Sequence, residues 1–257
     1  MNSVLLNKTI SAARTAGEII REHWQQPRTV HHKGRIDLIT KTDAAVEVHL
    51  RERLEHILPG VGFMGEESAD SLIPEGDCWI VDPLDGTTNF VHGIPFVAVS
   101  IALWQGGTSR IGVVSLPMLD ECFYAERGQG AYCNGRALRV SGAASCEQSL
   151  IATGFPYDID KQKDRILRWL GLVLSECRGV RRCGAAAVDL AFVAAGRYEA
   201  FFETGLKAWD IAAGWLLVEE AGGRVTNILG EPLRFGDAIL ASNGHVHREL
   251  VDLLKET

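Results

Sequence analysis

The chain has 257 residues, of which 46% are hydrophobic and 23% charged, and its formal net charge is −7. These values are typical of a globular enzyme with a substantial core, and the negative charge with no dense basic run argues against nucleic acid as the main ligand. With no apolar leader at the N-terminus and no apolar run of the ~20 residues that a membrane span needs, the sequence predicts a cytoplasmic protein.

The N-terminal region predicts two helices. Apolar residues recur at helical spacing from Leu5 to Ile20, and this helix is expected to stop before Pro27. A polar loop is predicted over residues 28–37, and a second amphipathic helix over residues 46–57. Both helices have one apolar face, so we expect them to pack against a sheet.

The most informative segment is CWIVDPLDGTTNF, which begins at Cys78. Its apolar start predicts a short buried strand that delivers Asp82 and Asp85, and Pro83 is predicted to end that strand. Gly86 and the threonines after it are typical of a tight turn that opens a helix. Two carboxylates at a strand end, beside free N–H groups at a helix start, can hold a hard cation and a phosphate together.

Ordinary explanations of this segment are weaker. An aspartate before a helix is most often only a cap, but Asp82 ends an apolar run, where a charge is costly unless it is paired or metal-bound. An EF-hand loop needs alternating acidic residues, and Pro83 and Leu84 break that alternation. A covalent aspartyl-phosphate mechanism needs a nucleophilic aspartate where this chain has Pro83.

Two further acidic clusters could complete a magnesium site. Glu66 and Glu67 follow the strand-like segment 61–64, and Asp210 precedes a predicted helix that ends at glycines 222 and 223. Taken alone, paired glutamates are more often solvated, and an aspartate in a first helical turn is more often a cap.

The rest of the chain predicts a layered fold. Strands are expected at 96–104 and 111–116 and a hairpin at 121–133, and the small-residue stretch 141–145 is the best candidate boundary. Beyond it, helices and strands alternate: strand 150–153, helices 160–177 and 185–195, strand 198–202, the helix after Asp210, strands 224–227 and 238–242, and helix 246–255. This alternation predicts an α/β fold with α+β layers, in two halves, 1–143 and 144–257, with the site in the cleft between them.

Three motifs in order resemble the inositol monophosphatase family, and specifically its bacterial-type members: Gly65–Ser68, Trp79–Phe90 and Trp209–Gly214. The segments 37–43 and 182–187 extend the resemblance over nearly the whole chain. Any one motif is weak, but the three together are specific. The resemblance implies a sandwich of alternating α-β-α-β-α layers, as in fructose-1,6-bisphosphatase, and a homodimer.

The resemblance also implies a metal site with two or three Mg²⁺ ions. Glu66, Asp82 and the carbonyl of Leu84 would hold one ion; Asp82, Asp85 and Asp210 would hold a second. A third, weaker ion would lie near Glu66, with Glu67 close by, mainly through water.

Catalytic and binding roles follow from the same resemblance. Thr87, linked to Asp43, would position and help deprotonate the attacking water, with Glu66 as the third catalytic residue. The implied phosphate- and substrate-binding residues are Asp85, the N–H groups of Gly86 and Thr87, Ala186, Glu203 and Lys33. Glu203 would accept hydrogen bonds from sugar-like hydroxyls, whereas Lys33 fits a solvated surface lysine equally well.

The implied activity is Mg²⁺-dependent, lithium-sensitive hydrolysis of inositol monophosphate without a covalent phosphoenzyme. Thr88 stands where nucleotide-type relatives favour lysine, which points to the inositol monophosphatase branch, while Lys207 and Ala185 depart from common family residues and leave the substrate open. The enzymatic alternatives are a fructose-1,6-bisphosphatase or a histidinol-phosphatase. The alternative from another class is a regulator that binds RNA or the transcription machinery.

Overall fold

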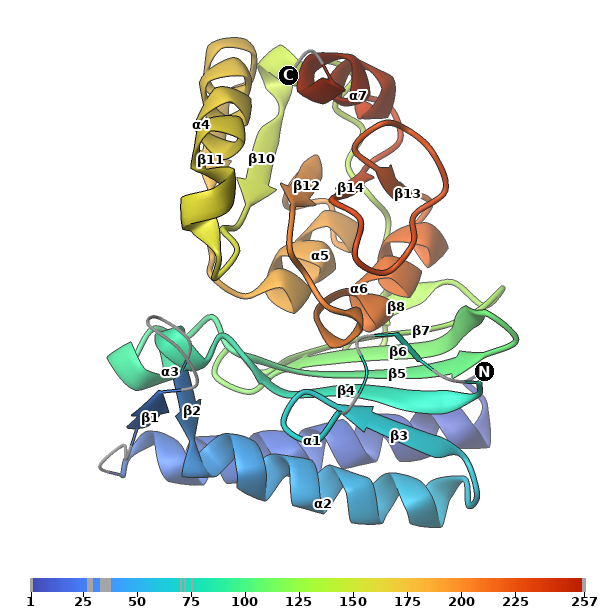
Figure 1. The fold of residues 1–257 in the computed structure, drawn as a ribbon. Helices are drawn as coiled ribbons and strands as arrows, with labels where there is room; N and C mark the ends of the chain where they lie inside the picture. The colour runs from blue at the N-terminus through green and yellow to red at the C-terminus, as the bar shows by residue number, and fades with distance from the viewer. Residues whose placement is uncertain are drawn as a thin grey trace.

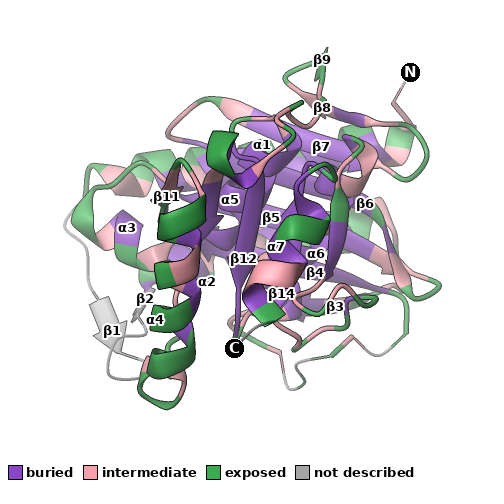
Figure 2. Cartoon of the chain, turned by 90° about the horizontal axis from the view of Figure 1, so that it is seen from above, coloured by how far each residue is buried: buried purple, intermediate pink, exposed green. Residues whose placement is uncertain are grey.

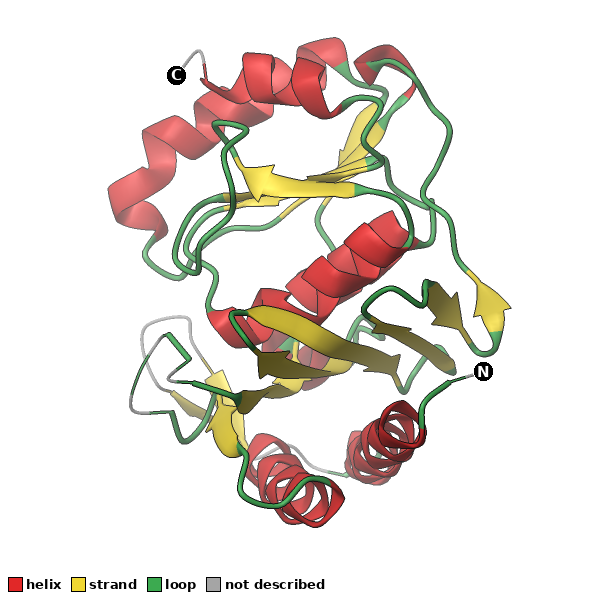
Figure 3. Ribbon diagram, turned by 90° about the vertical axis from the view of Figure 1, so that its right-hand side faces the viewer, coloured by secondary structure: helices red, strands yellow, loops and turns green. Residues whose placement is uncertain are grey.

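The computed structural model describes residues 2–26, 30–32, 38–69, 71, 73–74 and 76–255. Helices and sheets alternate in five layers, which confirms the predicted α-β-α-β-α architecture (Figures 1 and 3). The three helical layers are made of α1 and α2, of α5 and α6, and of α4 and α7. Their bounds are α1 Val4–Trp24, α2 Lys41–Ile57, α4 Ile159–Glu176, α5 Ala186–Ala194, α6 Ala208–Glu220 and α7 His247–Lys255.

The larger sheet has seven strands in the order β3-β4-β5-β6-β7-β8-β9. Only β3 and β4 pair in parallel; the other neighbours are antiparallel. The bounds are β3 Gly62–Gly65, β4 Cys78–Asp85, β5 Ala98–Gln105, β6 Thr108–Leu116, β7 Glu121–Glu126, β8 Ala131–Cys133 and β9 Arg136–Ala137. Apolar side chains of α1 and α2 share one buried cluster with this sheet, so the predicted packing of both helices is confirmed.

The smaller sheet has five strands in the order β11-β10-β12-β14-β13. The bounds are β10 Leu150–Thr153, β11 Gly179–Arg181, β12 Ala200–Glu203, β13 Arg224–Asn227 and β14 Ile239–Ser242. Trp169 of α4 and Leu250 of α7 pack with Phe202 and Leu240 of the sheet in one apolar cluster. The outer helices therefore cover the face of this sheet that is turned away from α5 and α6 (Figure 3).

The region after α1 differs from the prediction. Strands β1 (Val30–His32) and β2 (Leu38–Thr40) form an antiparallel pair, so the predicted loop over 28–37 is wrong for residues 30–32. Lys33 lies outside the described residues. Within the described part of the chain, no helix combines the length and the apolar character needed to cross a bilayer.

Strand β4 does not end at Pro83, so that prediction is wrong. The strand continues to Asp85, and its register against β5 shifts between Asp82 and Asp85. Proline lacks the N–H that a regular ladder requires, but an irregularity of the ladder leaves that N–H unneeded. The N–H of Leu84 donates to Oδ1 of Asp82 at 2.9 Å, within the same irregular stretch.

Helices α5 and α6 fill the space between the two sheets, where most of their residues are buried (purple in Figure 2). Their contact needs glycine, because a Cβ at Gly214 would lie 2.5 Å from the Cβ of Leu190. The hydroxyls of Ser100 and Ser109 donate to carbonyls of α6, at 3.2 Å to Trp209 and 2.8 Å to Ala212. One apolar cluster includes residues of both sheets, and a boundary at residue 143 stays a prediction.

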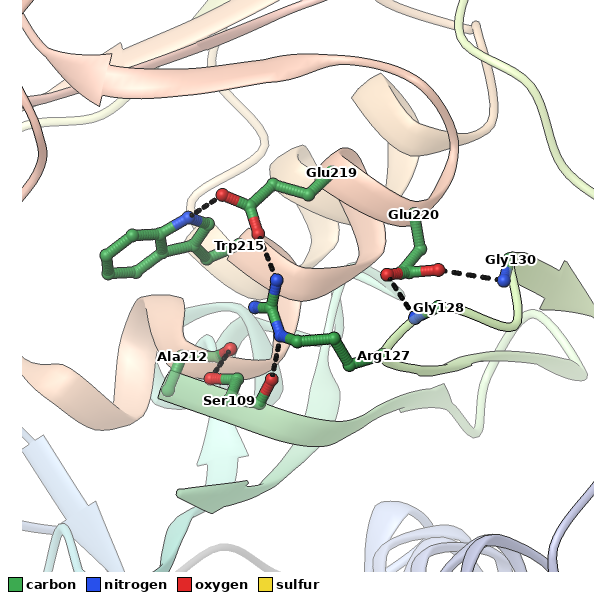
Figure 4. Close-up of polar contacts among 8 residues, drawn as sticks. All are labelled: Ser109, Arg127, Gly128, Gly130, Ala212, Trp215, Glu219 and Glu220. Atoms are coloured by element: carbon green, nitrogen blue, oxygen red, sulfur yellow. Dashed lines mark hydrogen bonds and ion pairs between the residues drawn. The ribbon is translucent and has the colours of Figure 1, made fainter. Parts of the chain in front are cut away.

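The C-terminal end of α6 is tied to the loop between β7 and β8 (Figure 4). Arg127 donates from Nε to the Ser109 carbonyl at 2.8 Å and from Nη1 to Glu219 at 3.0 Å. The carboxylate of Glu220 accepts from the N–H groups of Gly128 and Gly130, both at 2.8 Å. Negative charge at a helix C-terminus is unfavourable, and these donors offset it.

Arg127→Ala is expected to destabilise the protein by about 1 kcal/mol, the usual worth of a half-exposed ion pair with one added hydrogen bond. The midpoint of thermal unfolding should then fall by about 2–4 °C. The matched control is Arg248→Ala, because the Arg248 side chain is 94% exposed and 4.0 Å from Asp252. Equal midpoints for the two variants would show that the α6 contact contributes nothing to stability.

Candidate active site

A cavity of about 280 Å³ lies where the C-terminal end of β4 meets the starts of α5 and α6. Most of the sequence-predicted site residues line it: Glu66, Asp82, Leu84, Asp85, Gly86, Thr87, Ala186, Glu203 and Asp210. Asp43 and Glu67 do not line the cavity. Asp43 contacts Thr87, which does, and Glu67 follows the lining residue Glu66 in the chain. Segments far apart in the sequence thus converge at one place.

Among Glu66, Asp82, Asp85 and Asp210, Asp82 is the most buried, with 2% of its surface exposed. Its pKa is raised well above the usual value, first by burial and then by the charges of Glu66, Asp85 and Asp210. The four carboxyl groups are therefore close enough to repel one another.

Asp85 connects the strand end to the central helices. Its Oδ2 accepts a hydrogen bond from the N–H of Ala187 at 2.7 Å, in the first turn of α5. Burial raises its pKa to about 7, and the charge of Glu66 adds to the shift, while backbone donors of α5 oppose it. The carboxylate thus positions α5 with one oxygen.

Asp210 occupies the first turn of α6, where its Oδ2 accepts from the N–H of Lys207 at 2.6 Å. This capping contact is the ordinary explanation that the sequence already offered, and it engages one carboxylate oxygen. Asp210 is nevertheless close enough to Asp82 and Glu203 to raise the pKa of both, so it caps the helix and also lies within the acidic cluster.

Glu66 and Glu67 lie in the turn after β3, and a buried residue that sequence reasoning missed supports this turn. Glu47 of α2 is 5% exposed, and its Oε2 accepts from the N–H of Glu67 at 2.9 Å. A Cβ at Gly65 would lie 2.3 Å from that oxygen, so only glycine fits. The sequence held a signal, because Glu47 shares the apolar face of α2 with Leu50.

The acidic cluster fits hard divalent cations. Asp82 and Asp85 form no ion pair with any cationic side chain that the structure describes, so only backbone donors oppose the effects of burial and mutual repulsion. Across the described ranges, no three acidic, histidine or cysteine side chains form a ready-made cage for one ion. Mg²⁺ suits such a set, since it takes few carboxylates and keeps several waters.

Thr87 and Asp43 are in contact, as the sequence implied. The Thr87 hydroxyl lies 3.0 Å from Oδ1 of Asp43 and 3.1 Å from the Leu84 carbonyl, and it can donate to either. The other Asp43 oxygen accepts from the N–H of Thr40 at 2.9 Å, which completes a capping box at the start of α2. Burial raises the pKa of Asp43.

Gly86 precedes the short helix α3 (Thr87–His92) with a left-handed backbone, at φ 89°. A Cβ there would lie 2.8 Å from the Phe96 carbonyl, so the turn requires glycine. Asn89, which sequence reasoning missed, donates from Nδ2 to the carbonyls of Phe96 at 2.7 Å and Cys183 at 2.8 Å. It ties the turn after β4 to the segment that leads into α5.

Glu203 ends β12 and lines the cavity from the smaller sheet. A Cβ at Gly154 would be 2.1 Å from its Oε2, so the carboxylate packs directly against that glycine backbone. Burial raises the pKa of Glu203 well above its usual value, and the charge of Asp210 adds to the shift. Asp189 and Arg182 also line the cavity and were not predicted; Asp189 is the one acid in an apolar helix.

Without metal, stability should fall as pH rises. A carboxyl group whose pKa is raised by folding keeps its proton longer in the folded state, so its contribution is complete below the unfolded value and is lost as pH rises through the folded value. For Asp85 that window runs from 3.8 to about 7. His247 acts in the opposite direction, because burial lowers its pKa from 6.5 to about 4.

Thermal unfolding in EDTA between pH 5 and pH 8 measures this dependence. We expect the unfolding midpoint to fall toward pH 8, because above pH 6.5 the stabilising contribution of neutral His247 is complete and no longer grows, while buried carboxyl groups with a raised pKa still lose theirs. Mg²⁺ should raise the midpoint more at pH 8 than at pH 5. Asp85→Asn removes one of these titrating carboxyl groups and should make the unfolding midpoint depend less on pH. A wild-type midpoint that climbs over the whole range would contradict the charge crowding.

Comparison with known proteins identifies the family. A sequence model described as the inositol monophosphatase family matches residues 1–256. The Nus factor SuhB of Pseudomonas aeruginosa is 45% identical over 88% of this chain and 86% of that protein. The inositol-1-monophosphatase of Mesorhizobium japonicum is 42% identical over 99% of this chain and 97% of that protein.

The fold matches solved structures equally well. The extragenic suppressor protein suhB from Bartonella henselae superposes with a TM-score of 0.93 and 42% identity, covering 99% of both chains. With the family model, the relatives and the fold in agreement, the chain belongs to the inositol monophosphatase family of phosphatases.

Proposed function

We propose that this protein hydrolyses inositol monophosphate to inositol and phosphate in a magnesium-dependent reaction. The observation that carries the proposal is the cluster of Glu66, Asp82, Asp85 and Asp210 that lines the cavity, where burial and neighbouring carboxyl groups raise the pKa of Asp82 and Asp85. Such a cluster favours cations strongly, and a phosphate ester brings further oxygens that cations can bind.

Glu66, Asp82 and the Leu84 carbonyl would hold one Mg²⁺, and Asp85 and Asp210, with Asp82 shared, a second. When bound, the ions would supply positive charge for the phosphoryl oxygens and the leaving oxygen and would lower the pKa of a water molecule. Backbone N–H groups donate to Oδ2 of Asp85 and to Oδ2 of Asp210 and so orient both carboxyl groups, which line the cavity.

Thr87 and Asp43 would orient the attacking water. The Thr87 hydroxyl can donate its proton to Asp43 or to the Leu84 carbonyl, and its oxygen lone pair can then accept a proton from water. The N–H groups of Gly86 and Thr87 would hold the phosphate. Water attacks phosphorus directly in this scheme, and no covalent phosphoenzyme forms.

Glu203 would bind the leaving group. A carboxylate can accept hydrogen bonds from two neighbouring hydroxyls, and this one lines the cavity together with the acidic cluster. Ala186, at the start of α5, also lines the cavity and would contact the same substrate.

Initial rates on three phosphate esters would separate this proposal from its closest rivals. We expect inositol 1-phosphate to be hydrolysed fastest, ahead of fructose 1,6-bisphosphate and histidinol phosphate. A dominant rate on either rival substrate would assign the same site to that reaction.

A second role, in binding RNA or the transcription machinery, is supported by the relative that is named a Nus factor. Purification of tagged protein from a cell extract tests it, with the Asp82→Asn variant in parallel. Specific recovery of RNA polymerase subunits or RNA by both proteins would establish a role separate from catalysis. Recovery of neither RNA polymerase subunits nor RNA at physiological salt would contradict this second role.

A further inference from the structure

Asp189 is a buried acid whose position the proposed reaction leaves unexplained. It lies in the first turn of α5, a helix in which every other residue is apolar, and only 1% of its surface is exposed. A carboxyl group at such a position costs free energy unless it is hydrogen-bonded or paired. Nothing in the packing of α5 between the two sheets requires an acid there.

One oxygen of Asp189 has no hydrogen-bond partner in the part of the chain that the structure describes. The Cys183 thiol hydrogen-bonds to the carboxyl group, and the Cys183 sulfur lies 3.2 Å from the hydroxyl of Tyr198. These contacts hold the carboxyl group in one orientation. Its Oδ1, however, is buried with no hydrogen-bond partner among the described residues. Most buried carboxyl oxygens in folded proteins are satisfied, so this one indicates a group that is supplied from outside.

The surroundings of Asp189 indicate the chemistry of that group. The residue lines the same cavity as Glu203 and Asp85, and the charges of Asp189 and Asp85 both add to the raised pKa of Glu203. Arg182 lines the same cavity and opposes these effects, but the pKa of Asp189 and of Glu203 stays raised, so a further anion is not the expected partner of Asp189. An uncharged hydroxyl donor is the partner that fits, since it satisfies a carboxyl oxygen without adding negative charge.

We propose that Asp189 is a substrate-binding residue, and that its Oδ1 accepts a hydrogen bond from a ring hydroxyl of the polyol leaving group while Glu203 binds a different part of the ring. The inference rests on the proposed function and deepens it. Two buried carboxyl groups on one cavity select ring-shaped polyols rich in hydroxyl groups over simple alcohols, because a leaving group without the hydroxyl leaves Oδ1 unsatisfied.

Steady-state kinetics of Asp189→Ala on inositol 1-phosphate test the proposal. We expect KM to rise about tenfold with a smaller change in kcat, the loss expected for one hydrogen bond to a carboxylate. The magnesium concentration that gives half the maximal rate should stay unchanged, because Asp189 holds no ion. Asp189→Asn should recover most of the wild-type KM, since its amide oxygen can accept the same hydrogen bond.

Two controls keep the result interpretable. Glu199→Gln removes another buried acid. Glu199 accepts a hydrogen bond from the N–H of Leu150 at 2.6 Å and does not line the cavity, so this variant should leave KM unchanged. If Asp189→Ala does not fold, Asp189→Val fills the space and gives the same comparison. A wild-type protein that releases no phosphate would refute the proposed function. An active wild type with an unchanged KM in the alanine variant, or with a fall in kcat alone, would refute only the role of Asp189.

Discussion

Asp82→Asn is expected to lower the rate of phosphate release by about 10²- to 10³-fold or more, the cost of losing one group that organises stabilising charge. Asp82 is the acid that both proposed ions share, and it lies at the centre of the cluster. The variant should remain folded, because asparagine keeps the shape of the side chain and an oxygen to accept from the N–H of Leu84.

The same substitution should stabilise the protein when metal is absent. Burial and three neighbouring acids raise the pKa of Asp82, so removing its charge relieves both the repulsion and the cost of burying that charge. In EDTA, the unfolding midpoint should rise by about 2–4 °C per kcal/mol. An engineered loss of activity with a gain of stability distinguishes a functional cluster from a structural one.

Asp77→Asn is the matched control for this experiment. Asp77 precedes the start of β4, where it accepts from the N–H of Gly106 at 3.1 Å, and it lies outside the cavity. We expect the Asp77→Asn variant to release phosphate at the normal rate. Asp210→Asn should behave like Asp82→Asn, and near-normal turnover in either variant would contradict the two-metal assignment.

Thr87→Val is expected to reduce kcat by about 10²- to 10⁴-fold, the range that general acid–base assistance contributes. Valine has nearly the shape of threonine but cannot relay a proton between water and Asp43, whose Oδ1 lies 3.0 Å from the Thr87 hydroxyl. Thr87→Ser keeps the hydroxyl and should keep most of the activity. The measurement is kcat for inositol 1-phosphate at saturating Mg²⁺.

Asp43→Asn tests the other member of this pair. Its Oδ2 also caps α2, so some loss of stability is expected along with the loss of rate. If the valine and serine variants at position 87 were equally active, the hydroxyl would have no part in catalysis, and the attacking water would need another partner.

Local sequence patterns were sufficient to predict the elements that form the acidic site. The apolar run before Asp82, the glycine after Asp85 and the helix after Asp210 each carry a local signal, and the structure has β4, α3 and α6 there. The alternation of helices and strands likewise predicted a layered α/β fold, and the family resemblance implied its five layers. Such signals depend on residues close together in the chain.

Features that depend on distant partners were not predictable. Pro83 can lie within β4 because the pairing with β5 shifts register there, and no local pattern shows that partner. Asn89 joins the carbonyls of two segments, and Glu47 supports the Glu67 turn, through contacts that only the folded chain creates. Asp189 and Glu47 each offered a local signal that was overlooked: a single acid inside an apolar helix, and an acid on the apolar face of α2.

Phosphate release from inositol 1-phosphate at neutral pH, with Mg²⁺ added back to protein treated with EDTA, tests the central claim most directly. We predict no release in EDTA, a rate that rises and saturates with Mg²⁺, and suppression of that rate by lithium. A folded protein that releases no phosphate at any Mg²⁺ concentration, or that releases it equally fast in EDTA, would contradict magnesium-dependent hydrolysis at the acidic cluster.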